Sequence, residues 1–156
     1  MRVFVLTTLC LLVAVTPAAA QSNVDFTGTV ATVCALSLPT NGTLGLNPAG
    51  NVLSSEYGLA GSVTVLSIGS NNLAVDAPIW QVAPPAGYNA TGEALLVSYS
   101  GAAGLSAVNQ AFTASDTSVP IGTLAAAVLT VNNRVTNSNG FAEGTYTTRT
   151  VVTCTP

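Results

Sequence analysis

The last thirteen residues of the chain, "GTYTTRTVVTCTP" (144–156), alternate strictly between two sets of side chains. In an extended strand, where side chains alternate with a period of two, one face would carry Tyr146, Thr148, Thr150, Val152 and Cys154. The only charge of the run, Arg149, falls on the opposite face. We therefore expect the first face to point inward and the chain to carry Cys154 into its core.

Short alternating runs also fill the rest of the chain, separated by clusters of Gly, Pro and Asn, and no window shows a 3.6-residue period with helix caps. The runs that predict strands are 24–38, 43–46, 62–68, 73–82, 93–100, 111–113, 122–131 and 145–154. The run at 122–131, "GTLAAAVLTV", also has helix-forming residues, but Gly122 at the cap position and the β-branched end favour a strand. We expect residues 132–144 to join the last two strands, with a turn at Asn139-Gly140. The pattern predicts an all-β fold: an immunoglobulin-like antiparallel β-sandwich of about seven or eight strands.

The first twenty residues predict a secretory signal peptide. Arg2 precedes an apolar run, and Ala18-Ala19-Ala20 forms a cleavage site before Gln21. No other apolar stretch is long enough to span a bilayer. We therefore expect a single secreted domain over residues 21–156.

Two cysteines, Cys34 and Cys154, lie beyond the expected cleavage site. Cys34 shares its parity with Phe26 and Val30, so both sulfurs are expected to point inward. In an exported chain such a pair favours a disulfide over a metal site or a redox pair. The bond would close a loop of about 120 residues, and the chain-entropy account gives roughly 4–5 kcal/mol for it. The alternatives are two unpaired thiols or a bridge between chains.

The residue inventory argues against an enzyme. The sequence holds no His, and its three basic residues are all Arg. A Ser–His, Cys–His or Ser–Lys pair is therefore excluded, no catalytic residue is assigned, and neither a metal nor a cofactor is expected. Residues 21–156 carry two arginines against six isolated carboxylates, a net charge of −4, which offers nucleic acid or an anionic membrane almost no counterions.

Trp80 and Tyr88 flank a proline-rich turn, "APIWQVAPPAGY" (77–88). An exposed Trp in such a loop would suit a carbohydrate or a peptide. The other interpretation, which we favour, is a core Trp packed between the sheets near the disulfide.

The segments "VDFTGTVATVCALS" (24–37), "GTLGL" (42–46), "GSVTV" (61–65) and "GTYTTRTVVT" (144–153) resemble a bacterial pattern. They look like the pilin-like domains of chaperone–usher fimbrial subunits and of the spore coat protein U type. The resemblance implies a non-enzymatic subunit of a surface fimbria or coat, whose incomplete fold is completed by a strand donated from a neighbour. It also implies other copies or related subunits as partners, together with a periplasmic chaperone and an outer-membrane usher. The chain would then pass through the periplasm and reach the cell surface or the outside of the cell.

The chain departs from that pattern in two places. The family's second cysteine lies near the end of the second long strand, where this chain has Ser67, so Cys154 would take its place. Only three residues separate the expected cleavage site from the first alternating run. Either this run is itself the donor arm, with Val24, Phe26 and Val30 as its apolar contacts, or the domain is complete without it. The competing function is a monomeric secreted binding module that uses the Trp80–Tyr88 loop.

Overall fold

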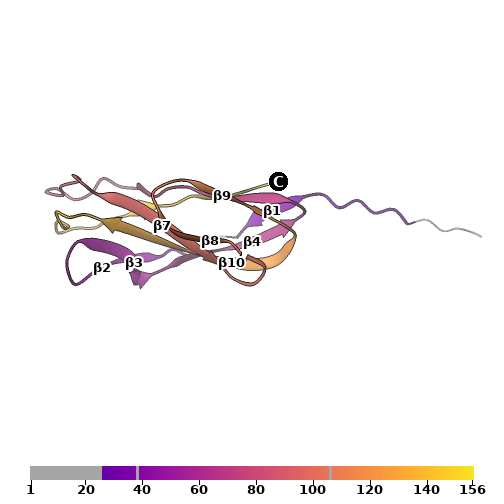
Figure 1. Cartoon of the computed structure of the whole chain (residues 1–156), viewed down its shortest axis with the longest axis horizontal. Helices are drawn as coiled ribbons and strands as arrows, with labels where there is room; N and C mark the ends of the chain where they lie inside the picture. The colour runs from indigo at the N-terminus through magenta and orange to yellow at the C-terminus, as the bar shows by residue number, and fades with distance from the viewer. Residues whose placement is uncertain (1–25, 38, 106) are drawn as a thin grey trace, which may run out of the picture.

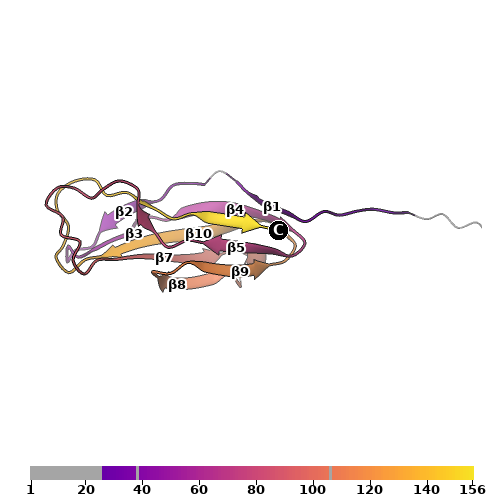
Figure 2. The same cartoon turned by 90° about the horizontal axis from the view of Figure 1, so that it is seen from above.

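The structure is a computed structural model that describes residues 26–37, 39–105 and 107–156. The expected signal peptide and Val24 lie outside the described residues. Within them the chain forms strands and one short 3-10 turn, and no α-helix. The body is elongated, and the segment leading into the first strand extends away from one end of it (Figures 1 and 2).

Twelve strand segments appear among the described residues. They are β1 (Val33–Leu36), β2 (Thr43–Leu46), β3 (Val52–Leu59), β4 (Gly61–Ile68), β5 (Asn71–Val75), β6 (Ile79–Trp80), β7 (Ala94–Gly101), β8 (Asn109–Thr113), β9 (Thr117–Ile121), β10 (Leu124–Thr136), β11 (Thr148–Arg149) and β12 (Val152–Thr155), with the turn η1 (Ala103–Leu105) between β7 and β8. The single strands expected at 73–82 and 145–154 are each divided in two, and β5 and β6 pair with β12 and β11, respectively. The all-β, antiparallel architecture predicted from the alternation is confirmed.

The strands form two layers. In the first sheet β10 is central: its first half pairs with β4, its second half with β3, and its other edge with β7. β1 extends this sheet beside β4, β2 beside β3, and β8 beside β7. In the second layer β5 lies between β12 and β9, and β6 pairs with β11. The first and last strands are therefore edge strands of opposite layers.

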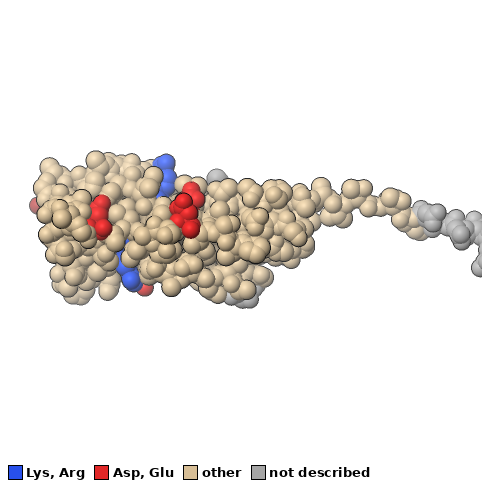
Figure 3. All heavy atoms as spheres, turned by 45° about the horizontal axis from the view of Figure 1, so that its top comes forward, with Lys and Arg blue, Asp and Glu red and all other residues tan. Residues whose placement is uncertain are grey.

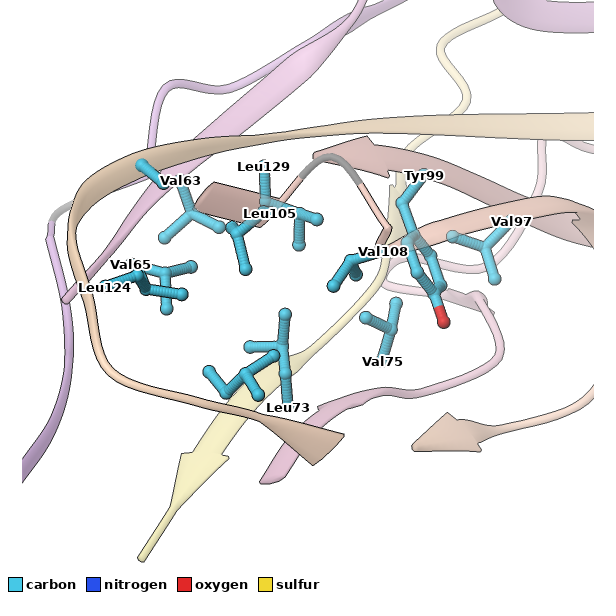
Figure 4. Close-up of a cluster of buried hydrophobic side chains, with 12 residues drawn as sticks. Val63, Val65, Leu73, Val75, Val97, Tyr99, Leu105, Val108, Leu124 and Leu129 are labelled. Atoms are coloured by element: carbon cyan, nitrogen blue, oxygen red, sulfur yellow. The ribbon is translucent and has the colours of Figure 1, made fainter. Parts of the chain in front are cut away.

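Aliphatic side chains from both layers fill the space between the sheets (Figure 4). Val65 of β4, Leu73 and Val75 of β5, Val97 of β7 and Leu129 of β10 are fully buried. Burying a side chain of this size stabilises a fold by about 1.5–3 kcal/mol. This shared core fixes the two sheets against each other and so positions their edges.

The expected strand over residues 24–38 is wrong in its first part. Only Val33–Leu36 is a strand, and residues 26–32 form none. Val33 pairs with Ile68, the last residue of β4, after which Gly69 turns the chain with a φ of 85°. Residues before Val33 therefore have no strand beside them in this sheet, whatever their alternation.

Residues 132–136, expected to belong to a connection, are the second half of β10. The turn expected at Asn139-Gly140 is present, since Gly140 N donates to Asn137 O at 3.0 Å and Gly140 has a φ of 74°.

Candidate functional site: a groove between the first and last strands

The C-terminal stretch turns inward the face that its sequence predicts. The inward set Tyr146, Thr148, Thr150, Val152 and Cys154 is half-buried, whereas Arg149, Val151 and Thr153 are exposed. This alternation turns one row of side chains toward the first sheet.

Cys34 and Cys154 form a disulfide, as predicted. It joins β1 to β12, with a Cα–Cα distance of 5.6 Å between partners that are 120 positions apart in the sequence. The edge strands of the two layers are therefore tied together at one end of the sandwich.

Beyond the disulfide a groove of about 790 Å³ opens between the segment that follows β1 and the stretch that leads into β12. One wall is the segment 39–44, which leads into β2, and the other is the stretch 146–152 of the C-terminal edge. Val63 of β4 and Val131 and Asn133 of β10 line the floor. The volume falls within the range of about 300–1,000 Å³ that is typical of ligand pockets.

The end of the groove nearer the disulfide is apolar. A pocket of about 220 Å³ is lined there by Leu36, Ser37, Pro39, Val63, Thr150 and Val152. Leu36 lies two residues after Cys34, and Val152 two residues before Cys154. The pocket therefore borders the disulfide.

The middle of the groove is polar and already hydrogen-bonded. Asn133 Nδ2 donates to Thr148 Oγ1 at 3.0 Å, and Thr150 Oγ1 donates to Asn133 Oδ1 at 2.8 Å. These bonds join β10 to the C-terminal stretch across the layers. The Asn133 amide and the two threonine hydroxyls already have hydrogen-bond partners. A segment lying over them therefore does not have to supply hydrogen bonds.

The segment that precedes β1, residues 26–32, is here called the arm; in sequence its alternation begins at Val24. Phe26 is 93% exposed and Val30 is 81% exposed. The structure thus leaves two of the three predicted contact residues in solvent, on a segment that points away from the body (Figure 1).

An aromatic cluster lies at the opposite end of the groove. Trp80, Tyr88, Phe141 and Tyr146 have neighbouring ring centroids 5.4–5.9 Å apart. Trp80 Nε1 donates to the Glu93 carboxylate at 3.2 Å, and Tyr88 Oη donates to Glu93 Oε2 at 2.6 Å. Burial of the phenol, followed by this hydrogen bond, raises the pKa of Tyr88 to about 12.

Trp80 does not pack between the sheets near the disulfide, the position that sequence reasoning favoured. Its half-buried ring contacts Tyr146, which precedes Cys154 by eight residues, or about 26 Å of extended strand. Trp80 and Tyr88 do lie together, as the loop hypothesis requires. However, both share the Glu93 carboxylate as a hydrogen-bond acceptor, an arrangement that holds the loop in place.

Among the described residues charged side chains are few, and residues 26–32 of the arm carry none. In the view of Figure 3 the visible ones lie on the body, at a distance from the end where the arm leaves it. Arg134 forms an ion pair with Glu56, and its guanidinium lies 3.7 Å from the centroid of the Phe112 ring. Among the described residues no three His, Cys, Asp or Glu side chains gather as a metal site would require. No helix in the same part of the chain is long and apolar enough to cross a membrane.

No protein-family model, curated protein or solved structure matches this chain. The site is therefore interpreted from its own geometry. That geometry consists of an exposed apolar arm, an unfilled groove between two edge strands and a disulfide at the groove's end. Of these, sequence reasoning predicted the disulfide, and it singled out the alternating run that contains the arm, although as a strand. It missed the wall at 39–44 and the floor residue Asn133.

Proposed function

We propose that this chain is a non-enzymatic structural subunit of an exported fimbria or coat, and that the arm of one copy lies in the groove of the next. The observation that carries the proposal is the presence, on one chain, of an exposed alternating arm and an unfilled groove. Edge strands present unpaired backbone groups that bind an added strand readily. The apolar leader, the disulfide and the lack of His and Lys support an exported, non-catalytic role.

The lengths of the arm and the groove agree. The alternation from Val24 to Val30 covers seven residues, and so does the wall from Tyr146 to Val152. At about 3.3 Å per residue each spans roughly 20–23 Å. A strand of this length placed between the two walls would face a free strand edge on each side.

The chemistry of the two surfaces also agrees. Phe26 is the largest apolar residue of the arm, and the 220 Å³ pocket is the apolar end of the groove. Gly28, on the same face two residues later, would lie over the hydrogen-bonded Asn133, where no side chain is needed. Val30 would then approach Tyr146 at the aromatic end.

This placement sets the direction of the arm. With Phe26 near the disulfide and Val30 near Tyr146, the arm runs antiparallel to the last strand. Its own domain then lies beyond the aromatic end of the acceptor, whereas the acceptor's arm leaves from the disulfide end at Val33. Such a contact is head-to-tail and does not close on itself, so it extends into a filament. During export a periplasmic chaperone would cover the same groove. At the outer membrane an usher would direct the replacement of the chaperone by the arm of the next subunit.

The test substitutes Phe26→Asp, with Thr29→Asp as the matched control. Both changes place one carboxylate on the arm, but Thr29 has the opposite parity and would face solvent. We expect Phe26→Asp to abolish ordered oligomers in sedimentation and electron microscopy, and Thr29→Asp to leave them. Because Phe26 is exposed in the single chain, neither change should shift the melting of a dilute monomer. Assembly that survives Phe26→Asp would rule out this use of the arm.

A further inference from the structure

The disulfide joins the two strands that continue the walls of the groove past its apolar end. Cys34 belongs to β1 and Cys154 to β12, and their neighbours Leu36 and Val152 line the apolar pocket. The bond is therefore adjacent to the site proposed for Phe26.

The two strands joined by the disulfide belong to different sheets. β1 pairs with β4 from Val33 to Leu36, and β12 pairs with β5 from Val152 to Thr155. The hydrogen bonds that cross between the layers near the groove run from Asn133 on the floor. Near the apolar end the Cys34–Cys154 bond is therefore the covalent tie between the two edges, in addition to the core that both layers share.

We infer that the Cys34–Cys154 disulfide is a redox latch on the groove: the oxidised chain captures an arm, and the reduced chain captures it weakly. The inference rests on the proposed function. The oxidised bond holds the two edges at a fixed spacing, and a binding site that is already in its bound geometry loses less free energy on ordering. A dithiol reductant supplies two electrons and two protons; the S–S bond breaks, two thiols form, and the dithiol closes into its own cyclic disulfide.

Linkage makes the effect reciprocal. If oxidation tightens arm binding by some factor, a bound arm stabilises the disulfide by the same factor. Couplings between sites are typically about 5- to 150-fold. Each tenfold step corresponds to a shift of about 30 mV in a two-electron midpoint potential, toward more negative values when the arm is bound. An assembled subunit would therefore resist reduction, and an unoxidised one would be left out of the polymer.

The experiment uses the chain from Gln21 to Pro156 and a fluorescein-labelled peptide of residues 22–33. Fluorescence anisotropy measures peptide affinity for the oxidised and the reduced chain. Dithiothreitol redox buffers give the midpoint potential of the disulfide with and without saturating peptide. Trp80, the only Trp of the chain, lies at the far end of the groove, and its emission without peptide reports whether the reduced chain stays folded. Leu129→Ala, a core substitution that keeps the disulfide, is the control for lost stability.

We expect reduction to weaken peptide binding about 5- to 150-fold, with a matching negative shift of the potential, while Trp80 emission and the affinity of oxidised Leu129→Ala stay unchanged. Equal affinities and an unshifted potential would overturn the latch but leave the proposed function standing. Loss of the folded Trp80 signal on reduction, or an equal loss of affinity in Leu129→Ala, would also overturn it, since the bond would then act through the whole fold. An oxidised chain that does not bind the peptide would refute the proposed function itself.

Discussion

Replacing Phe26 by Ala in the arm peptide tests the anchor quantitatively. Phe26 is 93% exposed in the single chain, so burial in the groove would remove almost the whole side chain from water. Full burial of a Phe stabilises by about 1.5–3 kcal/mol. At 1.4 kcal/mol per factor of ten, the loss corresponds to a dissociation constant raised about 10- to 150-fold.

The assay compares peptides of residues 22–33 by anisotropy against the oxidised chain. Phe26→Leu, which keeps an apolar side chain of similar reach, should recover most of the affinity. Thr27→Ala, on the opposite face, should bind like the unaltered peptide. If Phe26→Ala bound as tightly as the unaltered peptide, or if Thr27→Ala lost as much affinity, the assignment of Phe26 to the apolar pocket would be refuted.

Three further predictions concern the body of the protein and its export. Leu129→Ala, at a position with 0% exposure, should lower the free energy of unfolding by about 2–5 kcal/mol in urea, and a loss below 0.5 kcal/mol would contradict the assigned core. The pKa of Tyr88 is raised to about 12 from an ordinary 10.0, so the contribution of its phenol to stability is complete below pH 10 and is lost as the pH rises through 12. Tyr88→Phe should therefore flatten the decline of the unfolding free energy at alkaline pH. An unchanged slope would count against the Glu93 contact. N-terminal sequencing of the exported protein should begin at Gln21, and a mature chain that retains Ala20 would show that the cleavage site is wrong.

The sequence predicted the C-terminal edge well because its alternation is uninterrupted and one face carries the only charge. The same parity argument paired Cys34 with Cys154 correctly. It also favoured a strand over a helix for 122–131, where β10 begins at Leu124. In each case a local pattern and the packing of the sheets require the same arrangement.

Where the prediction failed, the deciding partner lies far away in the sequence. The arm alternates like a buried strand, but β4 ends at Ile68 and leaves it nothing to pair with. β9 was missed because Pro120 interrupts its pattern, and the proline is tolerated since β9 is an edge strand of its sheet. The polar end of β10 looked like a connection, although Asn133 and Arg134 are strand residues held by Thr148 and Glu56, respectively.

The groove could not be predicted from local patterns at all. It exists because the first and last strands are edges of different layers, which is a property of the topology. The hydrogen bonds in the middle of the groove could not be predicted from the sequence either, because Asn133 and Thr148 are 15 residues apart and meet only across the two sheets.

The most direct test of the central claim is an isotope-filtered nuclear Overhauser experiment on the oxidised, ¹³C-labelled chain bound to the unlabelled peptide of residues 22–33. The account predicts contacts from the Phe26 ring of the peptide to the methyl groups of Val63 and Val152, and contacts from Val30 toward Tyr146. Contacts to other surfaces, or the opposite order along the groove, would contradict the claim that one copy's arm completes the groove of the next.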